Sequence, residues 1–275
     1  MRITLGYIDK KSPIHELTGA TKLICLVLCS LITMMTYDTR ILIGILILSI
    51  IAFRLSKVKF DEVAFVIYFI LVFLVLNNIA IFIFSPYEGV KIYESESELF
   101  KIVGSYSMTS EQLFYHLNIS LKYFAVIPIA LLFMTTTHPS EFAASLNRIG
   151  VSYRIAYAVA IALRYIPDVQ RDYQDICFAQ QARGLDISKK EKLPRRIKNI
   201  TSILMPLIFS TLQWIDTISS AMELRAFGIH KTRTWYRGKD FEKRDYVTLS
   251  IVLILFVLFI IITINNGGRF YNPFK

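Results

Sequence analysis

The sequence predicts an all-α integral membrane protein with about five transmembrane helices and a further set of amphipathic cytoplasmic helices. Of its 275 residues 54% are hydrophobic, which exceeds the usual share in a soluble domain. These residues gather in long uncharged runs, and an uncharged run crosses a bilayer as a helix because its backbone must bond internally. The formal net charge of +10 is concentrated in a few segments between the runs. We therefore interpret it as a signal of membrane topology and lipid contact, with no nucleic acid as partner.

A helical hairpin is predicted at the start of the chain. Residues 23–35 and 41–53 are apolar, and the turn-like residues 37–40 separate them. Each run is short for a span, since about 20 residues cross a bilayer. Flanking residues must therefore extend both helices.

The next apolar run, residues 63–84, predicts the clearest span. It holds 22 residues without a charge, and Asn77 and Asn78 are its strongly polar members. These amides could cap a break in the helix or contact a substrate, but we expect them to hydrogen-bond to a neighbouring helix. Residues 85–117 predict a polar loop, and residues 118–136 predict the fourth span.

The chain changes character after this span. Apolar residues continue in shorter pieces, and residues 155–163 are too few to cross a membrane. Residues 202–222 predict an amphipathic helix. One stripe of that helix is polar and the opposite stripe apolar: Ser210, Gln213, Thr217 and Ser220 against Ile208, Leu212, Ile215 and Met222.

Three parts follow from this pattern. Residues 1–137 are expected to form an N-terminal membrane domain of four transmembrane helices. Residues 138–245 are expected to form a cytoplasmic region of coupling helices. Residues 246–275 are expected to form the last transmembrane helix and an external tail.

The distribution of Lys and Arg predicts the orientation. The segment up to Lys22 holds 4, residues 54–62 hold 3 and residues 137–245 hold 18, whereas the segments on the other side of the predicted spans hold 5. Because cytoplasmic loops carry the excess of positive charge, the N-terminus is expected inside and the C-terminus outside. The chain would then be a multi-pass protein of a bacterial-type cell membrane.

The sequence lacks the residues that several kinds of chemistry require. Apart from Lys122, the five apolar cores contain no Asp, Glu, Lys, Arg or His, which disfavours an ion-coupled carrier. The three cysteines and four histidines show no metal-ligand spacing, and the sequence has no P-loop. We therefore expect a non-catalytic subunit that binds no cofactor or metal and is driven by another protein.

Two similar helix endings are the most distinctive feature: the first tip, Ala182-Arg183-Gly184, and the second tip, Leu224-Arg225-Ala226. Each follows a helix-favouring run, and a cation suits the negative end of a helix dipole. Basic helix caps would explain each ending by itself. A guanidinium flanked by small residues can also enter a narrow groove and form paired bonds to a carboxylate. Two tips match a partner with two equivalent grooves, such as a dimer of ATPases.

At these residues the chain resembles a known family, the transmembrane T component of energy-coupling factor (ECF) transporters, also called the EcfT/CbiQ family. The resemblance lies in residues 162–167 (ALRYIP), 179–184 (AQQARG) and 221–228 (AMELRAFG). The second tip departs from the family pattern, because Leu-Arg-Ala stands where Ala-Arg-Gly is expected.

The resemblance implies a subunit that couples two ABC-type ATPases to a small membrane-embedded substrate-binding protein, the S component, for uptake of a vitamin or a transition-metal ion. The ATPases would bind ATP and Mg²⁺. The residues expected to dock in them are those of the two tips: Ala182, Arg183, Gly184, Leu224, Arg225 and Ala226. The residues expected to contact the S component are apolar ones: Ile155, Ala158, Leu163, Leu204, Ile208 and Leu212.

Other functions stay open on the sequence. The membrane subunit of another ABC importer class would also dock in ATPases, but usually through one helix. A membrane-bound enzyme acting on lipid-linked substrates would need converging acids, and Asp168, Asp172 and Asp175 are the nearest acidic cluster. A membrane scaffold would need neither feature.

Overall fold

The computed structural model describes residues 7–95, 97–103, 106–185, 193–230, 234–236, 238–266 and 268–273. Within these residues the chain forms helices and one two-stranded sheet. They divide into two compact units, the first made of Met1–His138 with Lys239–Lys275, and the second of Pro139–Gly238. The second unit is thus an insertion in the sequence of the first.

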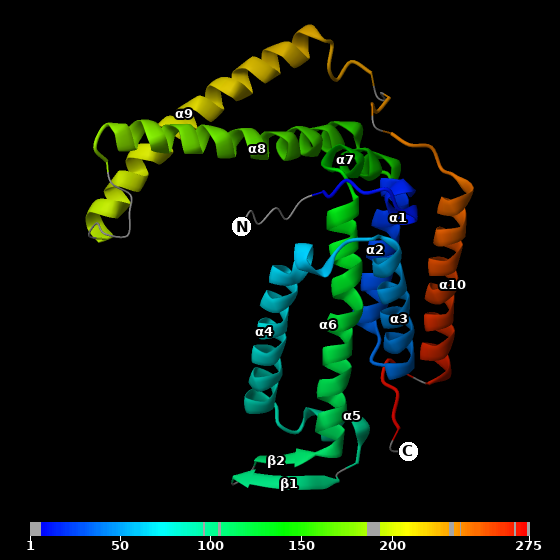
Figure 1. The fold of residues 1–275 in the computed structure, drawn as a ribbon. Coiled ribbons are helices and arrows are strands. Elements are labelled where there is room, and N and C mark those ends of the chain that lie inside the picture. The colour runs from blue at the N-terminus through cyan, green and yellow to red at the C-terminus, as the bar shows by residue number, and fades with distance from the viewer. Residues whose placement is uncertain are drawn as a thin grey trace. The chain divides into compact units, whose positions relative to one another are not determined.

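The first unit is a bundle of long helices (Figure 1). Its members are α2 (Gly19–Met35), α3 (Thr39–Leu55), α4 (Phe60–Phe84), α6 (Ser110–Thr136) and α10 (Lys243–Asn265), with the short α1 (Pro13–Glu16) before them. Helix α6 packs against α2, α3 and α4, and α2 packs against α10. One buried cluster joins four helices through Ile32, Ile45, Ala125 and Phe259. These apolar contacts form the core of the unit.

Three of the described helices, α4, α6 and α10, are long and apolar enough to cross a membrane. Helix α4 is apolar on all sides, with a mean hydropathy of 2.7 in its most apolar window, as a lipid-facing helix requires. Helices α2 and α3 have 17 residues each, so they rise about 25 Å, somewhat less than a hydrocarbon core of about 30 Å. The prediction of an all-α membrane protein is confirmed.

The prediction of a polar loop over residues 85–117 is wrong. The segment contains α5 (Glu88–Tyr93) and an antiparallel hairpin of β1 (Glu98–Val103) and β2 (Tyr106–Thr109), in which Glu98 pairs with Thr109. Helix α6 already begins at Ser110, capped by the side chain of Thr109.

The physical reason lies in two buried polar residues of the first turn of α6. The carboxylate of Glu111 accepts hydrogen bonds from the backbone N–H (3.2 Å) and hydroxyl (2.9 Å) of Ser97. The Gln112 Oε1 accepts one from the N–H of Gly89 at 2.8 Å. Side chains that a sequence pattern assigns to solvent therefore bind the preceding segment to α6.

Asn78 confirms the expected contact between helices. Its Oδ1 lies 2.8 Å from Nδ1 of His116 on α6, while its Nδ2 donates to the carbonyl of Leu74 within α4 at 2.9 Å. Helix α4 continues through this residue to Phe84. The amide is thus a polar link between α4 and α6.

Helix α10 is fastened to the start of α2 by Asp245. This buried carboxylate accepts hydrogen bonds from the N–H (2.9 Å) and hydroxyl (3.1 Å) of Thr18, and from the N–H of Glu242 (2.9 Å). Nearby, the buried ammonium of Lys22 donates to the carbonyl of Thr136 at 2.8 Å. These bonds place the last helix in the same unit as the first ones.

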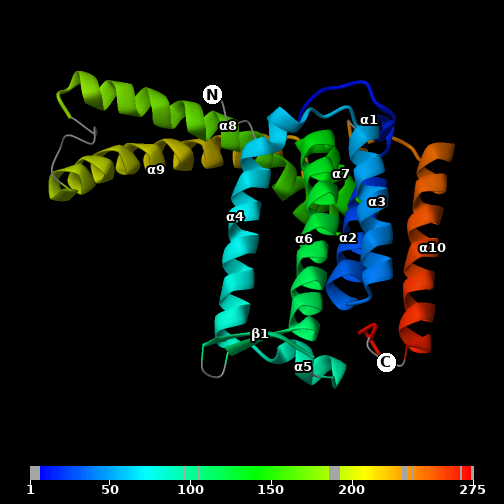
Figure 2. The same ribbon diagram turned by 60° about the horizontal axis from the view of Figure 1, so that its bottom comes forward.

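The residues after α10 lie at the end of the first unit that also holds α5 and the β-hairpin (Figures 1 and 2). Tyr37 donates its N–H to the carbonyl of Arg269 at 2.8 Å, and its ring stacks on Phe270 at 4.6 Å. The guanidinium of Arg40 lies 4.0 Å from the ring centre of Tyr271. The residues after α10 thus bind to the connection between α2 and α3.

The described residues of the second unit form three helices: α7 (Pro139–Arg148), α8 (Tyr153–Ala182) and α9 (Leu193–Leu224). Helix α8 runs through Pro167 and α9 through Pro206. The two helices contact each other, with the Ser210 hydroxyl donating to Asp172 at 3.3 Å. The nine apolar residues of 155–163 therefore belong to a helix of 30 residues.

Candidate functional site

The first tip is the C-terminal cap of α8. Arg183 is the cap residue, and Gly184 follows it with a left-handed φ of +84°. The N–H of Leu185 donates to the carbonyl of Gln180 at 3.1 Å, and that of Gly184 to Gln181 at 2.9 Å. This pair of bonds is a Schellman motif, which satisfies carbonyls that the helix leaves without partners.

The second tip repeats this geometry at the end of α9. The N–H of Phe227 donates to Met222 at 3.0 Å, and that of Ala226 to Glu223 at 2.9 Å. Ala226 takes the left-handed position with φ +53°. Arg183 and Arg225 therefore occupy the same place relative to their helices, immediately before the left-handed residue.

The departure from the family pattern has a structural meaning here. An L-residue with a Cβ in the left-handed region is less favourable than glycine by about 1 kcal/mol. Ala226 adopts that conformation, whereas Gly184 in the first tip adopts it without a Cβ. The second tip is thus held in shape by contacts beyond its own backbone preference.

Those contacts come from four aromatic rings, which we call the aromatic anchor: Tyr153, Tyr157, Phe227 and Trp235. The ring of Phe227 lies 4.7 Å from that of Tyr157 and 5.7 Å from that of Tyr153. Trp235 lies 5.6 Å from Tyr153 and donates its indole N–H to Asn147 on α7 at 3.1 Å. The residues after the second tip are therefore bound to the beginning of α8 and to α7.

Sequence reasoning missed the aromatic anchor. Phe227 stands within the segment that carries the family resemblance, yet its partners lie far away in the chain. The guanidinium of Arg154 also donates to the carbonyl of Gly228 at 3.3 Å. Only the fold brings these residues together.

The two tips lie at opposite ends of α8. The first tip ends the helix, while Phe227, beside the second tip, contacts Tyr157 near its beginning. The stretch of α8 from Tyr157 to Arg183 rises about 40 Å at about 1.5 Å per residue. The unit thus presents two arginines on separate points of a long helical frame.

All six predicted docking residues are exposed: Ala182, Arg183, Gly184, Leu224, Arg225 and Ala226. Leu224 is 88% exposed, which is unusual for a leucine at a helix end. A tip that combines an exposed arginine with small or apolar neighbours is suited to docking on another protein.

A second feature of this unit is a groove of about 450 Å³ between α8 and α9. Tyr165, Trp214 and Ile215 are among the side chains that line it, and Asp172 lies at its edge. Of the residues expected to contact an S component, Ala158 lines this groove. Leu163 is half-buried, and the other four are exposed: Ile155, Leu204, Ile208 and Leu212.

The predicted apolar stripe on α9 faces α8 only in part. Ile215 and Met222 line the groove against α8, whereas Ile208 and Leu212 do not line it. Ile208, Leu212 and Ile215 are all about half exposed, at 48%, 50% and 56%. Leu204, Ile208 and Leu212, at a spacing of four residues, therefore present apolar surface outside the groove.

The acidic cluster serves the unit's own structure. Asp168 pairs with Arg171 at 3.4 Å, and Asp172 accepts from Ser210. In the part of the chain that the structure describes, His, Cys, Asp and Glu form no group able to hold a metal ion.

Comparison with known proteins gives a consistent result. The family model CbiQ, described as cobalt transport protein, matches residues 10–236. A Staphylococcus aureus protein named energy-coupling factor transporter transmembrane protein EcfT is 25% identical over 272 residues, covering 92% of this chain and 95% of that protein. A protein of the same name from Streptococcus equi subsp. equi is 26% identical over 277 residues, covering 98% of each.

A third relative carries a different name. A putative ABC transporter ATP-binding protein from Bifidobacterium longum is 29% identical over 160 residues, which cover 55% of this chain and 20% of that longer protein. The family model covers most of the chain, and the full-length relatives share one name. The chain therefore belongs to the CbiQ/EcfT family, the transmembrane components of energy-coupling factor transporters.

Proposed function

We propose that this chain couples two ABC-type ATPases to a membrane-embedded substrate-binding S component, using its two arginine tips as the docking points. The observation that carries this proposal is the repeated geometry of the tips. Two helices end in the same Schellman motif with an exposed arginine at the same position. A single basic cap needs no partner, but two matched ones suit two equivalent sites.

The chemistry of the tips favours ATPases as partners. Guanidinium keeps its charge when it is partly buried and forms paired hydrogen bonds to a carboxylate. In each tip the arginine extends from a rigid helix, so little conformational entropy would be lost on docking. The relative from Bifidobacterium longum, which is named as an ATP-binding protein, supports the same association. ATP and Mg²⁺ would bind to the ATPases.

The long helices suggest how motion would be transmitted. A change in the separation of the two ATPases would move the tips, and α8 and α9 would carry that movement along their length. The exposed apolar residues Ile155, Leu204, Ile208 and Leu212 would then press on the S component, with Ala158 and Leu163 close to them. The transported substrate would be a vitamin or a transition-metal ion, chosen by the S component.

The membrane placement belongs to the same proposal. With α2 and α3 as short spans, five helices would cross the bilayer. The excess of Lys and Arg would place the N-terminus and residues 139–238 in the cytoplasm and the C-terminus outside. The tips would then lie on the side where ATP is available.

The first experiment is purification of the tagged chain from its native membrane in mild detergent, followed by mass spectrometry of the proteins that accompany it. ABC ATPases together with a small, very hydrophobic protein are the expected result. ATPases with an extracellular binding protein would instead indicate another importer class. If an intact complex contained no ATPase, the proposal would be refuted.

The second experiment tests the tips directly. The purified complex is reconstituted in vesicles, and ATP-dependent uptake is measured for the double variant Arg183→Ala with Arg225→Ala. We expect uptake to be lost. Arg164→Ala is the matched control, because Arg164 is an exposed arginine within α8 and not at a tip. Full uptake by the double variant would contradict the docking role.

A further inference from the structure

A groove between α3, α4 and α6 combines a long apolar lining with positive charge at one end. It measures about 710 Å³, within the usual range of ligand pockets, about 300–1,000 Å³. Apolar side chains such as Phe53, Ile67, Leu71 and Ile127 line it. Its two charged residues are Arg54, in the last turn of α3, and Lys57, just beyond that helix.

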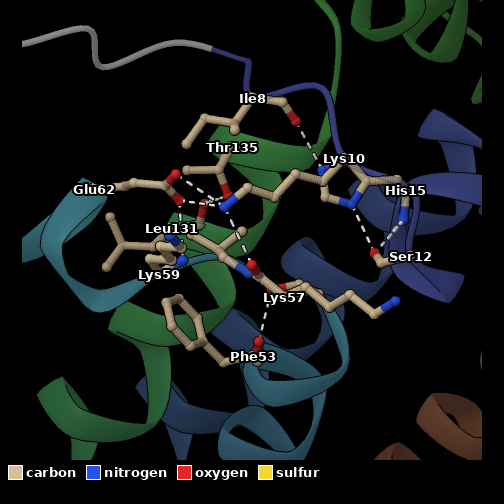
Figure 3. A network of polar contacts seen from close by, with 12 residues as sticks. Ile8, Lys10, Ser12, His15, Phe53, Lys57, Lys59, Glu62, Leu131 and Thr135 are labelled. Carbon is tan, nitrogen blue, oxygen red and sulfur yellow. Dashed lines mark hydrogen bonds and ion pairs between the residues drawn. The ribbon is translucent and has the colours of Figure 1, made fainter.

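The two cations are available to a ligand. Both side chains are exposed, and neither forms an ion pair with another of the described residues. The nearby acid Glu62 is already paired, because the ammonium of Lys10 lies 2.6 Å from its carboxylate. Figure 3 shows this pair, and the side chain of Lys57 extends away from it. The charge at this end of the groove is therefore net positive.

The backbone at this corner is fixed by the N-terminal segment. Lys57 has a left-handed φ of +58°, and its carbonyl accepts a hydrogen bond from Lys10 at 3.2 Å (Figure 3). Ile8 donates its N–H to the carbonyl of Thr135 at the end of α6 at 2.8 Å. Two hydrogen bonds from the N-terminal segment thus fix this corner, one to the backbone of Lys57 and one to the end of α6.

The length of the groove matches half of a bilayer. Along α4 its lining runs from Phe60, in the first turn, to Leu71. That stretch rises about 16 Å, and the hydrocarbon core of one leaflet is about 15 Å thick. A molecule with an anionic head at Arg54 and Lys57 would therefore have room for one acyl chain down to the bilayer centre.

We propose that this groove binds an anionic phospholipid, with Arg54 and Lys57 on its phosphate and one acyl chain between α4 and α6. Arginine bonds phosphate through its planar fork, and lysine adds a point charge. Basic pockets between transmembrane helices recognise anionic lipids through this chemistry. The bound lipid would fill the space beside α4 and stabilise the position of this helix against α3 and α6.

A transmembrane helix of a partner protein is the main rival occupant. The charge of the groove argues against it, because an apolar helix seated there would cover two cations without neutralising them. A lipid phosphate neutralises them and remains at the water interface. A lipid would therefore match both the charged end and the apolar end of the groove.

The experiment measures lipid retention by native mass spectrometry of the full chain. The protein is extracted from vesicles of phosphatidylcholine containing one tenth phosphatidylglycerol. We expect the wild type to retain phosphatidylglycerol in preference to phosphatidylcholine. Arg54→Gln with Lys57→Gln should lower that retention about twenty-five-fold, since each cation lost near the surface is worth about a five-fold change.

Two further variants separate the contributions. Lys11→Gln with Lys243→Gln removes the same charge from exposed lysines that do not line the groove, and it should leave retention unchanged. Leu71→Trp keeps the charge but fills the apolar end, and it should lower retention. Thermal unfolding of each variant in detergent shows whether it is folded.

Three outcomes would overturn the proposal. Equal retention of the two lipids by the wild type would remove the basis for a specific site. Equal loss in both double variants would assign the effect to general surface charge. If Leu71→Cys cross-linked to a partner protein in the native complex and no lipid was retained, the groove would be a subunit interface.

Discussion

The ends of α8 and α9 form the same cap from different residues, and they differ in what holds them. Gly184 provides the left-handed residue of the first tip, and a Cβ added there would meet nothing within 4 Å. In the second tip the left-handed residue is Ala226, and the adjacent Phe227 is bound by the aromatic anchor. The first tip is thus shaped by its own backbone and the second by the packing around it.

This difference suggests a division of roles between the two docking points. The first tip stands at the C-terminal end of a helix of 30 residues, so its position follows any bending of α8. The second tip is fixed to the first turns of that helix. We therefore expect the second tip to act as the fulcrum and the first tip as the moving end.

The largest effect that tests this comparison is on ATPase binding. Arg183→Ala should weaken it about thirty-fold, the effect of losing a hot spot of about 2 kcal/mol. The free energy of unfolding should change by less than about 0.5 kcal/mol, because the side chain is exposed. Affinity is measured with the purified ATPases, and unfolding by heat in detergent. A large loss of stability would show that Arg183 serves the fold.

Removing a ring of the aromatic anchor should affect the second tip but not the first. Phe227→Ala deletes the ring contacts with Tyr153 and Tyr157 and should lower the free energy of unfolding by about 2 kcal/mol. In double-mutant cycles for ATPase binding, we expect it to be non-additive with Arg225→Ala and additive with Arg183→Ala. Phe178→Ala, at a ring 66% exposed on α8, is the control. Equal coupling to both arginines would remove the distinction between the tips.

An exchange of the two left-handed residues gives a smaller effect. Gly184→Ala should destabilise the protein by about 1 kcal/mol, and Ala226→Gly should stabilise it by up to about 1 kcal/mol. Since a Cβ at Gly184 meets open space, the first effect is a backbone effect alone. Thermal unfolding measures both. If both substitutions changed the free energy of unfolding in the same direction, packing and not the φ angle would determine the conformation of one of the caps.

A change of pH should act on the first unit through His15. Burial lowers the pKa of His15, with the charges of Lys22 and Lys10 acting in the same direction and Asp9 and the carbonyl of Ile8 opposing them. The Ser12 hydroxyl and the Ile8 carbonyl, 2.7 and 2.9 Å from its ring nitrogens, suit a neutral ring. The unfolded chain then binds the proton more tightly than the folded one.

The stability that His15 contributes should therefore be complete above about pH 6.5 and decrease as the pH falls below that value. Thermal unfolding between pH 8 and pH 5.5 measures this, and His15→Gln should flatten the curve in that range. A loss of ATPase binding that follows the titration of His15 would connect the two units in an unexpected way.

Patterns along the chain could predict the membrane helices and the places where α8 and α9 end. Those features depend on local properties: apolar runs, charge and the preference of glycine for a left-handed turn. The same patterns wrongly assigned residues 110–117 to a polar loop. Glu111 and Gln112 are polar, but they bury their polar groups against the segment that precedes α6 in the chain.

The aromatic anchor, and the part of the apolar stripe of α9 that faces α8, were beyond prediction for a related reason. Phe227 and Tyr157 are joined only by the folding of α9 along α8. A helical stripe shows that a face is apolar, but it does not show whether Ile215 and Ile208 share one partner. Such questions are settled by tertiary contacts, which a single sequence does not contain.

The bond between Thr18 and Asp245 has a consequence for how the protein is made. These residues are 227 positions apart, and all of the second unit is synthesised between them. Helices α2, α3, α4 and α6 are therefore synthesised while the backbone N–H of Thr18 still lacks its final acceptor. Only when α10 leaves the ribosome can its carboxylate reach that site, so a premature stop anywhere in the second unit leaves the first unit incomplete as well.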